Sequence, residues 1–246
     1  MHRRIDVEAA FTDFVRRFGG QIVSDLVGPS PDHLNADYYF SDQRIVAELK
    51  CLEDNKREDQ NIQIKVQRLF DRWMDEGTIP VFYGESIRVK SKSLPESCQR
   101  VLLEVYKPPI QRRVQKANKQ IKSTAQRLRL DEYLGLLLLV NDGNYALESN
   151  AILYQISRIL GNQFRNINTV IYFTVNMAAS SPHTSKPTLV WAEATRKPLP
   201  SISTEFMAAL FGGWKAHLEV LLGEPIEPVY LLDVAQLENI RYETRI

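Results

Sequence analysis

The chain has 246 residues, of which 44% are hydrophobic and 25% charged, a composition typical of a globular protein with one large core or two small ones. Its formal net charge of +1 excludes a strongly basic or acidic protein, so any binding of nucleic acid must depend on a local patch of one charge. The two cysteines match neither a disulfide framework nor a zinc site, and no stretch is apolar enough for a membrane span or a signal peptide, so we expect a cytoplasmic protein with no membrane partner.

The N-terminal region predicts a helix and then a strand. Apolar side chains recur at helical spacing over residues 5–18, and Gly19 and Gly20 end the pattern. Glu8 lies one turn into this helix, off its apolar face. Residues 21–27 read as the first strand, and residues 28–31 as a loop.

Residues 35–50, NADYYFSDQRIVAELK, predict two short strands around a polar turn. In the first strand, Ala36 is expected to face the same way as the aromatic residues at positions 38 and 40, with Asp37 on the other face. In the second strand, Glu48 and Lys50 alternate with apolar residues and therefore project from one face.

The length of the turn sets the register of this hairpin. A four-residue turn at 41–44 puts Phe40 opposite Ile45 and, counting outward, Asp37 opposite Glu48. A two-residue turn would put the two acids diagonal, still on one face. Two carboxylates forced together on a partly buried face share a proton or hold a cation, and Lys50 adds a donor beside them. The simpler interpretation is a solvated strand face that carries a weak surface ion pair.

This pattern resembles the PD-(D/E)XK nuclease superfamily, in which an acid on one core strand is followed on the next by an acid, a spacer and a lysine. The matching residues are Asp37, Glu48 and Lys50, with Leu49 as the spacer; Ala36 stands where the family often has proline. The resemblance implies a restriction-endonuclease-like α/β fold, with a mixed central sheet flanked by helices.

The resemblance also implies an activity, the hydrolysis of DNA phosphodiester bonds. Asp37, Glu48 and the backbone carbonyl of Leu49 would hold Mg²⁺, for which Mn²⁺ can substitute, and Lys50 would act beside the metal. Because an acid on the first helix joins the site in many members, Glu8 is a candidate metal-associated residue. The alternative for Glu8 is an acid that only stabilises the N-terminus of its helix.

Residues 54–108 are interpreted as a mostly helical insertion into one nuclease-like domain. They contain an amphipathic helical pattern over 62–74, a short strand at 80–83, and a helix from about 95 to 106 that ends at Pro108 and Pro109. The core of the domain is expected at about 5–53 and 109–176, and residues 177–246 are expected to extend the sheet and add a helix.

The helix predicted after the two prolines carries a one-signed charge. No acid occurs over 105–130, while an apolar stripe at helical spacing lets the helix pack on a sheet. Its exposed side is expected to bind backbone phosphates of DNA, although a solvated face is the simpler interpretation. Gln120 resembles a polar residue that some family members place near the catalytic lysine. The expected nucleic-acid-binding residues are Arg112, Arg113, Lys116, Lys119, Gln120 and Lys122.

The remaining elements are predicted from short apolar patterns. Residues 133–140 read as a strand buried on both faces, 141–144 as a turn and 147–160 as a helix. Strands are expected at 169–175, 188–194 and 229–232, with a loop containing His183 between the first two. Residues 202–222 predict a helix interrupted or bent at Gly212 and Gly213. This C-terminal segment is expected to carry the dimer contact or the substrate specificity.

Two functions from different classes follow from this reading. The first is a metal-dependent nuclease in restriction, defence or repair; because cutting both strands often takes a pair of sites, a homodimer is expected with it. The second is a catalytically silent protein of the same fold that binds nucleic acid or a protein partner. A structure with Asp37 and Glu48 far apart would instead indicate an unrelated α/β protein.

Overall fold

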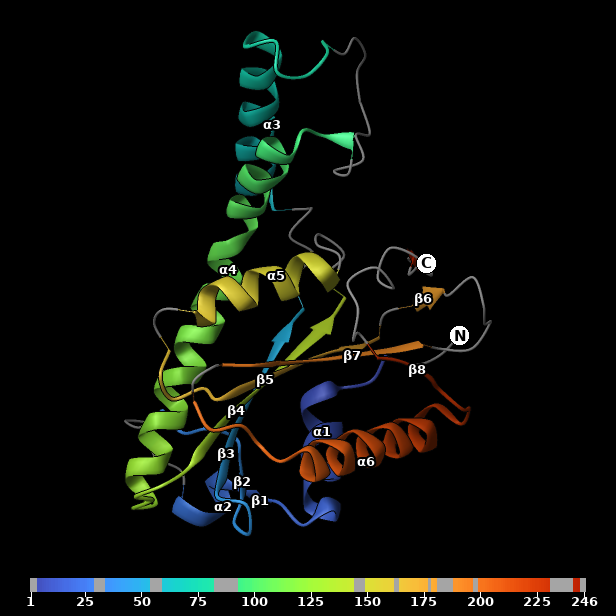
Figure 1. Cartoon of the computed structure of the whole chain (residues 1–246). Helices are drawn as coiled ribbons and strands as arrows, with labels where there is room; N and C mark the ends of the chain where they lie inside the picture. Colours follow the sequence, from blue (N-terminus) through green and yellow to red (C-terminus); the bar gives the residue numbers. More distant parts are fainter. Residues whose placement is uncertain are drawn as a thin grey trace.

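A seven-stranded mixed sheet with helices on both faces forms the centre of the molecule (Figure 1). The structure is a computed structural model, and it describes residues 4–28, 34–53, 59–81, 93–143, 149–161, 164–176, 178–180, 188–196, 199–230 and 241–243. The strand order is β1-β2-β3-β4-β5-β7-β8. The prediction of a mixed α/β sheet flanked by helices is therefore confirmed.

The N-terminal part of the sheet is an antiparallel meander preceded by a helix. Asp6 caps helix α1 (Val7–Phe18) by accepting the Ala9 N–H, and Gly19, at φ 91°, ends it. Strand β1 (Gln21–Ile22) pairs with β2 (Tyr38–Phe40), and β2 pairs with β3 (Ile45–Leu52).

The predicted strand at 21–27 is wrong beyond Ile22, because the chain turns there into the short helix α2 (Val23–Val27). The neighbouring strand β2 begins only at Tyr38. Directly before it, the Asp37 carbonyl accepts a hydrogen bond from the Val23 N–H. A strand beyond Val23 would have no neighbouring strand to pair with. Helix α2 instead satisfies the backbone N–H and C=O groups of this segment by local hydrogen bonds.

The rest of the main sheet is built on buried parallel strands. Strand β4 (Leu134–Asp142) is parallel to both β3 and β5 (Thr169–Val175), β7 (Thr188–Thr195) is antiparallel to β5, and β8 (Glu227–Tyr230) is parallel to β7. The predicted strands in these regions are confirmed. Strands β6 (Ala178–Ser180) and β9 (Arg241–Glu243) form a separate two-stranded sheet. His183 and residues 231–232 lie outside the described residues.

Two pairs of helices cover the two faces of the sheet. Helices α1 and α6 (Thr204–Leu222) bury one face, and α4 (Glu96–Arg127) and α5 (Ser149–Leu160) bury the other. Helix α6 is continuous through the two glycines where an interruption was predicted. A Cβ on Gly213 would lie 2.9 Å from the ring of Phe14, so this glycine serves the close packing of α1 on α6.

Helix α3 (Gln60–Asp75) and the N-terminal half of α4 form an arm that projects beyond the sheet (Figure 1). The arm has its own small apolar cluster, which contains Trp73, Ile79, Leu94 and Cys98. The insertion is thus helical over 60–75 and 96–108. Of the strand predicted at 80–83, residues 80 and 81 form no strand, and the other two lie outside the described residues.

The helix break predicted at Pro108 and Pro109 is wrong, because α4 runs unbroken over 32 residues. Each proline removes a backbone donor and so costs a helical hydrogen bond. Packing on both sides opposes this loss, since Cys98 is buried in the arm while Ile110 and Val114 are buried against the sheet. None of the described helices combines the length and the apolar character that a membrane span requires.

Candidate functional site

The hairpin of β2 and β3 has the register that the four-residue turn predicts. Phe40 pairs with Ile45, and Tyr38 pairs with Ala47. One position further, the same register puts Asp37 opposite Glu48. Asp37 itself immediately precedes β2. The expectation for Ala36 is wrong: this residue packs against the α4 side of the sheet, whereas Tyr38 packs on the α1 side. Strand alternation fails there because Ala36 lies before the strand.

Asp37, Glu48 and Lys50 come together at this end of the hairpin. The Lys50 ammonium forms an ion pair with Oε1 of Glu48, and Oδ2 of Asp37 accepts the Leu49 N–H at 2.8 Å. Glu48 is fully buried, and the Lys50 side chain is 17% exposed. The simpler interpretation from the sequence, a solvated face with a surface pair, does not describe this site.

The two carboxyl groups perturb each other. Burial, and then the negative charge of Asp37, raises the pKa of Glu48 to about 8. Burial also raises the pKa of Asp37, while the Leu49 N–H and the charges of Lys50 and Lys116 oppose that rise. The side-chain contact with Asp37 raises the pKa of Glu48 further, and the raised pKa leaves Glu48 protonated at neutral pH in the absence of a cation.

The acid pair has the donor set that a hard divalent cation prefers. With both groups ionised, Oε2 of Glu48 is buried and has no hydrogen-bond donor among the described residues. A buried carboxylate oxygen without a partner is unfavourable unless it takes a proton or a cation. Two carboxylates with a backbone carbonyl beside them suit Mg²⁺, which binds oxygen ligands.

Leu49 and Glu8 line the same cavity as Asp37 and Lys50. The cavity has a volume of about 260 Å³. The Leu49 N–H points across the gap to Asp37, and because the N–H and C=O of one strand residue point to the same edge, its carbonyl faces this gap as well. The residue that the resemblance implies as a carbonyl ligand is therefore oriented toward the acids.

Glu8 belongs to a second group of possible ligands. The ligand atoms of Glu8, Cys51 and Glu53 all lie within 4.8 Å of one another. Burial, and then the charges of Glu8 and Glu53, raises the pKa of the Cys51 thiol to about 12, so the thiol stays protonated at neutral pH. This group was missed because Cys51 was assigned to the core; the alternation of β3 puts residues 51 and 53 on one side, facing α1.

Helix α4 contacts both chain segments that carry the site. Arg113 Nε donates to the Cys51 carbonyl at 2.9 Å, just beyond Lys50. Gln120 Nε2 donates to the Asn35 carbonyl at 2.8 Å, and Thr124 Oγ1 accepts the Ala36 N–H at 2.6 Å. The segment that leads into Asp37 is thus held by α4. Sequence analysis missed Thr124, since a threonine on an apolar helix face gives no sign of its partner.

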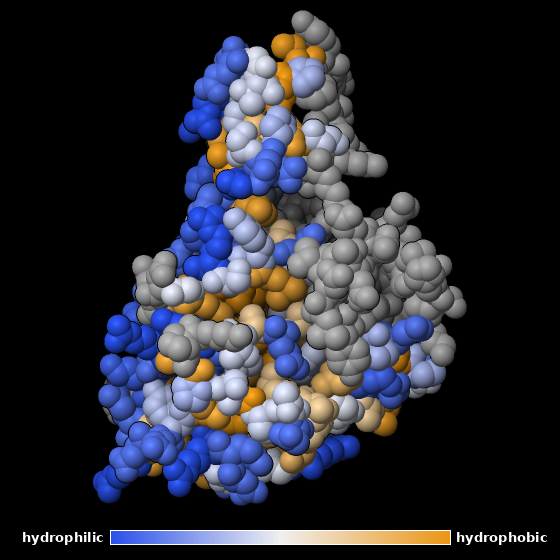
Figure 2. Space-filling model, viewed as in Figure 1, coloured by the Kyte–Doolittle hydropathy of each residue, from blue (hydrophilic) through white to orange (hydrophobic). Residues whose placement is uncertain are grey.

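The predicted nucleic-acid-binding residues divide among different sides of α4. Arg113, Lys116 and Gln120 follow one another at helical spacing on the side that borders the site. Arg112 and Lys119 are exposed and lie two turns apart on the outer side. Hydrophilic residues cover much of the left edge of Figure 2, where α4 lies in Figure 1.

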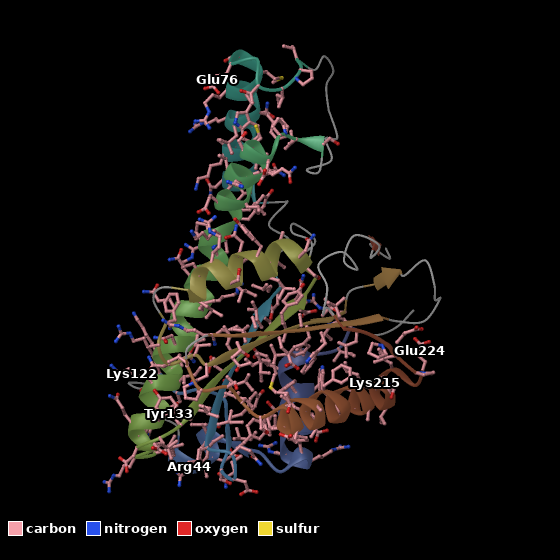
Figure 3. All side chains as sticks on the ribbon, viewed as in Figure 1. Arg44, Glu76, Lys122, Tyr133, Lys215 and Glu224 are labelled. Carbon is pink, nitrogen blue, oxygen red and sulfur yellow. The ribbon has the colours of Figure 1, made fainter. Side chains whose placement is uncertain are left out.

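Lys122 lies on yet another side of this helix. It follows Gln120 by two positions, which puts it on roughly the opposite side of α4. It lies one turn from Asn118, whose side chain accepts the Asn166 N–H at 3.0 Å from the loop before β5. Figure 3 shows Lys122 at the outer edge of the molecule, away from the sheet.

Comparison of the chain with protein-family models, with curated proteins and with solved structures found no match.

Proposed function

We propose that this chain is a metal-dependent nuclease of the PD-(D/E)XK superfamily, with a restriction-endonuclease-like core, and that it hydrolyses phosphodiester bonds in DNA. The observation that carries the proposal is the facing pair of acids, in which buried Glu48 has one unpartnered oxygen and Lys50 is paired with the other. A surface ion pair needs no second carboxylate opposite it, whereas a cation site does.

The order of elements supports the same proposal. Helix α1 leads into the antiparallel strands β1, β2 and β3, and helix α4 then leads into β4, which runs parallel to β3. Apart from the short helix α2 and the arm, this is the helix, three strands, helix and strand series that the resemblance implies. The residues proposed for the site are Asp37, directly before β2, and Glu48 and Lys50 on β3.

In the proposed reaction, Asp37, Glu48 and the Leu49 carbonyl would hold Mg²⁺ or Mn²⁺. The ion would polarise the phosphodiester as a Lewis acid and make a bound water more acidic. Hydrolysis joins a water oxygen to phosphorus and breaks the bond to the leaving oxygen, which receives a proton. Lys50 donates hydrogen bonds to the phosphate oxygens as their negative charge grows. Burial of Glu48 keeps this carboxylate fixed and limits competing water.

A cleavage assay with site variants tests the proposal. Supercoiled plasmid, linear duplex and branched DNA are incubated with the full chain in Mg²⁺, in Mn²⁺ and in EDTA. We expect cleavage only with a divalent ion, and we expect Lys50→Ala and Asp37→Asn each to lower the rate by roughly 100-fold or more. Lys215→Ala, on α6 across the sheet from α4, removes the same charge as Lys50→Ala and is expected to cut at the wild-type rate.

The same assay separates the alternatives. DNA that is bound at low salt but stays intact with either ion, in wild type and in Lys50→Ala alike, would indicate the catalytically silent binding protein instead. The plasmid product reports on assembly: because one site cuts one strand, direct conversion to the linear form would indicate that two chains act together. Accumulation of the nicked form would indicate a single chain.

A further inference from the structure

One basic side chain of α4 is placed between the two contacts that join this helix to the site. Arg113 binds the Cys51 carbonyl beyond Lys50, and Gln120 binds the Asn35 carbonyl before Asp37. These two residues are seven positions apart and so lie on the same side of the helix, two turns from each other. Lys116 follows Arg113 by three positions and precedes Gln120 by four, so it lies on this side, between the two anchor points.

The charge of Lys116 is not committed to another group. Its side chain is exposed, and it forms no ion pair with any carboxylate in the part of the chain that the structure describes. Two other basic residues of α4, by contrast, are engaged: Arg127 donates to the Val27 carbonyl, and Lys107 pairs with Glu104. Lys116 is also close enough to Asp37 for the two charges to interact.

We propose that Lys116 binds the phosphate group that enters the acid pair, so that this phosphate lies between the Lys116 ammonium and the Asp37–Glu48 side of the site. The inference rests on the proposed nuclease function and narrows it. Lys116 is assigned the contact with the strand that is cut. Arg113 and Gln120 hold α4 against the hairpin. The outer residues Arg112 and Lys119 contribute only general electrostatic attraction to DNA.

A lysine suits this position physically. Its ammonium is a compact charge on a flexible stem, so it can follow a phosphate without a fixed bidentate geometry. A cation opposite two acids also offsets the repulsion that these acids exert on an incoming polyanion. Loss of Lys116 should therefore affect both the binding of DNA and the placement of the bond to be cut.

The test compares Lys116→Ala with Lys65→Ala, which removes an identical charge from an exposed position of α3 in the arm. Binding of a short fluorescent DNA duplex is measured with Mg²⁺ at several salt concentrations in the Lys50→Ala background, where cleavage is expected to be slow. Cleavage at saturating DNA is measured with Lys50 present. Because both side chains are exposed, thermal unfolding is expected to stay at the wild-type temperature in both variants.

For Lys116→Ala we expect the slope of log affinity against log salt to shrink by about one phosphate contact, and the saturating rate to fall roughly tenfold or more. For Lys65→Ala we expect an unchanged salt slope and no loss in saturating rate. Equal effects in the two variants, or an unchanged slope in Lys116→Ala, would overturn the inference.

Failure of the proposed function gives a different result. A wild-type chain that binds DNA but never cuts it rejects the nuclease, while the salt slopes still decide whether Lys116 contacts a phosphate. A chain that neither binds nor cuts DNA rejects both proposals.

Discussion

Glu48 is the residue on which the chemistry of the hairpin depends. Its carboxyl group is buried, faces Asp37 and pairs with Lys50, so it has one cationic partner and one acidic neighbour. In the absence of a divalent ion, the shared proton relieves the repulsion between the acids. Binding of an ion would displace this proton, because carboxylate ligands bind metals in the ionised form.

The pH dependence of stability follows from the raised pKa of Glu48, which is about 8 in the folded chain against 4.5 ordinarily. Between these two values the folded state binds more protons than the unfolded state, so the free energy of unfolding should fall as pH rises. In EDTA we expect a loss of up to about 1.4 kcal/mol per pH unit from this group, measured by urea unfolding from pH 5 to pH 8.

The matched variant is Glu48→Gln, which keeps the shape of the side chain without an ionisable group. Its unfolding free energy should vary less over the same pH range. Addition of Mn²⁺ should reverse the loss in wild type, more strongly at pH 8 than at pH 6, and should have little effect on the variant. Parallel pH curves for the two chains in EDTA would contradict the assignment of the proton to Glu48.

Helix α4 connects the arm, the sheet and the candidate site within one element. Its first half packs with α3, and its second half covers the sheet and holds the segment before Asp37 through Gln120 and Thr124. A helix broken at Pro108 would separate these functions into two independent pieces. Because α4 is continuous, a displacement of the arm can be transmitted to the segment before Asp37 through this one helix.

The continuity of α4 can be tested at Pro108, which is exposed. Proline in a helix interior costs about 3 kcal/mol relative to alanine, and its removal also frees the unfolded chain by about 0.4–1 kcal/mol. We therefore expect Pro108→Ala to raise the free energy of unfolding by roughly 1–3 kcal/mol, measured with urea.

The control for this prediction is Pro95→Ala at the N-cap of the same helix. Proline near a helix start loses no hydrogen bond, so this change should give no gain. If neither variant is more stable than wild type, the helix is not continuous at Pro108.

The elements that the sequence predicted well are those whose pattern is local. Alternation and turn length were sufficient for the register that brings Asp37 opposite Glu48, and a continuous apolar run was sufficient for β4. The failures depended on partners elsewhere in the chain. Residues after Ile22 leave the sheet because β2 is short, and the proline pair stays helical because packing on both sides outweighs its cost.

At the scale of the whole molecule, the described residues form three apolar clusters, and α4 joins the cluster on one face of the sheet to the small cluster of the arm. The main cores lie on the two faces of the sheet and include Trp214, whereas the arm depends on a small cluster around Trp73. Small clusters bury little apolar surface, and regions with few buried contacts open at a lower free energy than the global one. The arm should therefore open independently of the sheet.

Replacement of either tryptophan by alanine tests this independence through amide hydrogen exchange. Trp73→Ala should speed exchange in α3 and in the first half of α4, with protection in β4 retained, because only the arm cluster loses contacts. Trp214→Ala should lower the global free energy of unfolding by about 3–5 kcal/mol and so reduce protection in β4, while the arm keeps the exchange rates of its own local opening. If Trp73→Ala also speeds exchange of the β4 amides, the arm and the sheet unfold as one cooperative unit. A movement of the arm would then affect the Asp37 hairpin through the packing of the whole fold, and not through α4 alone.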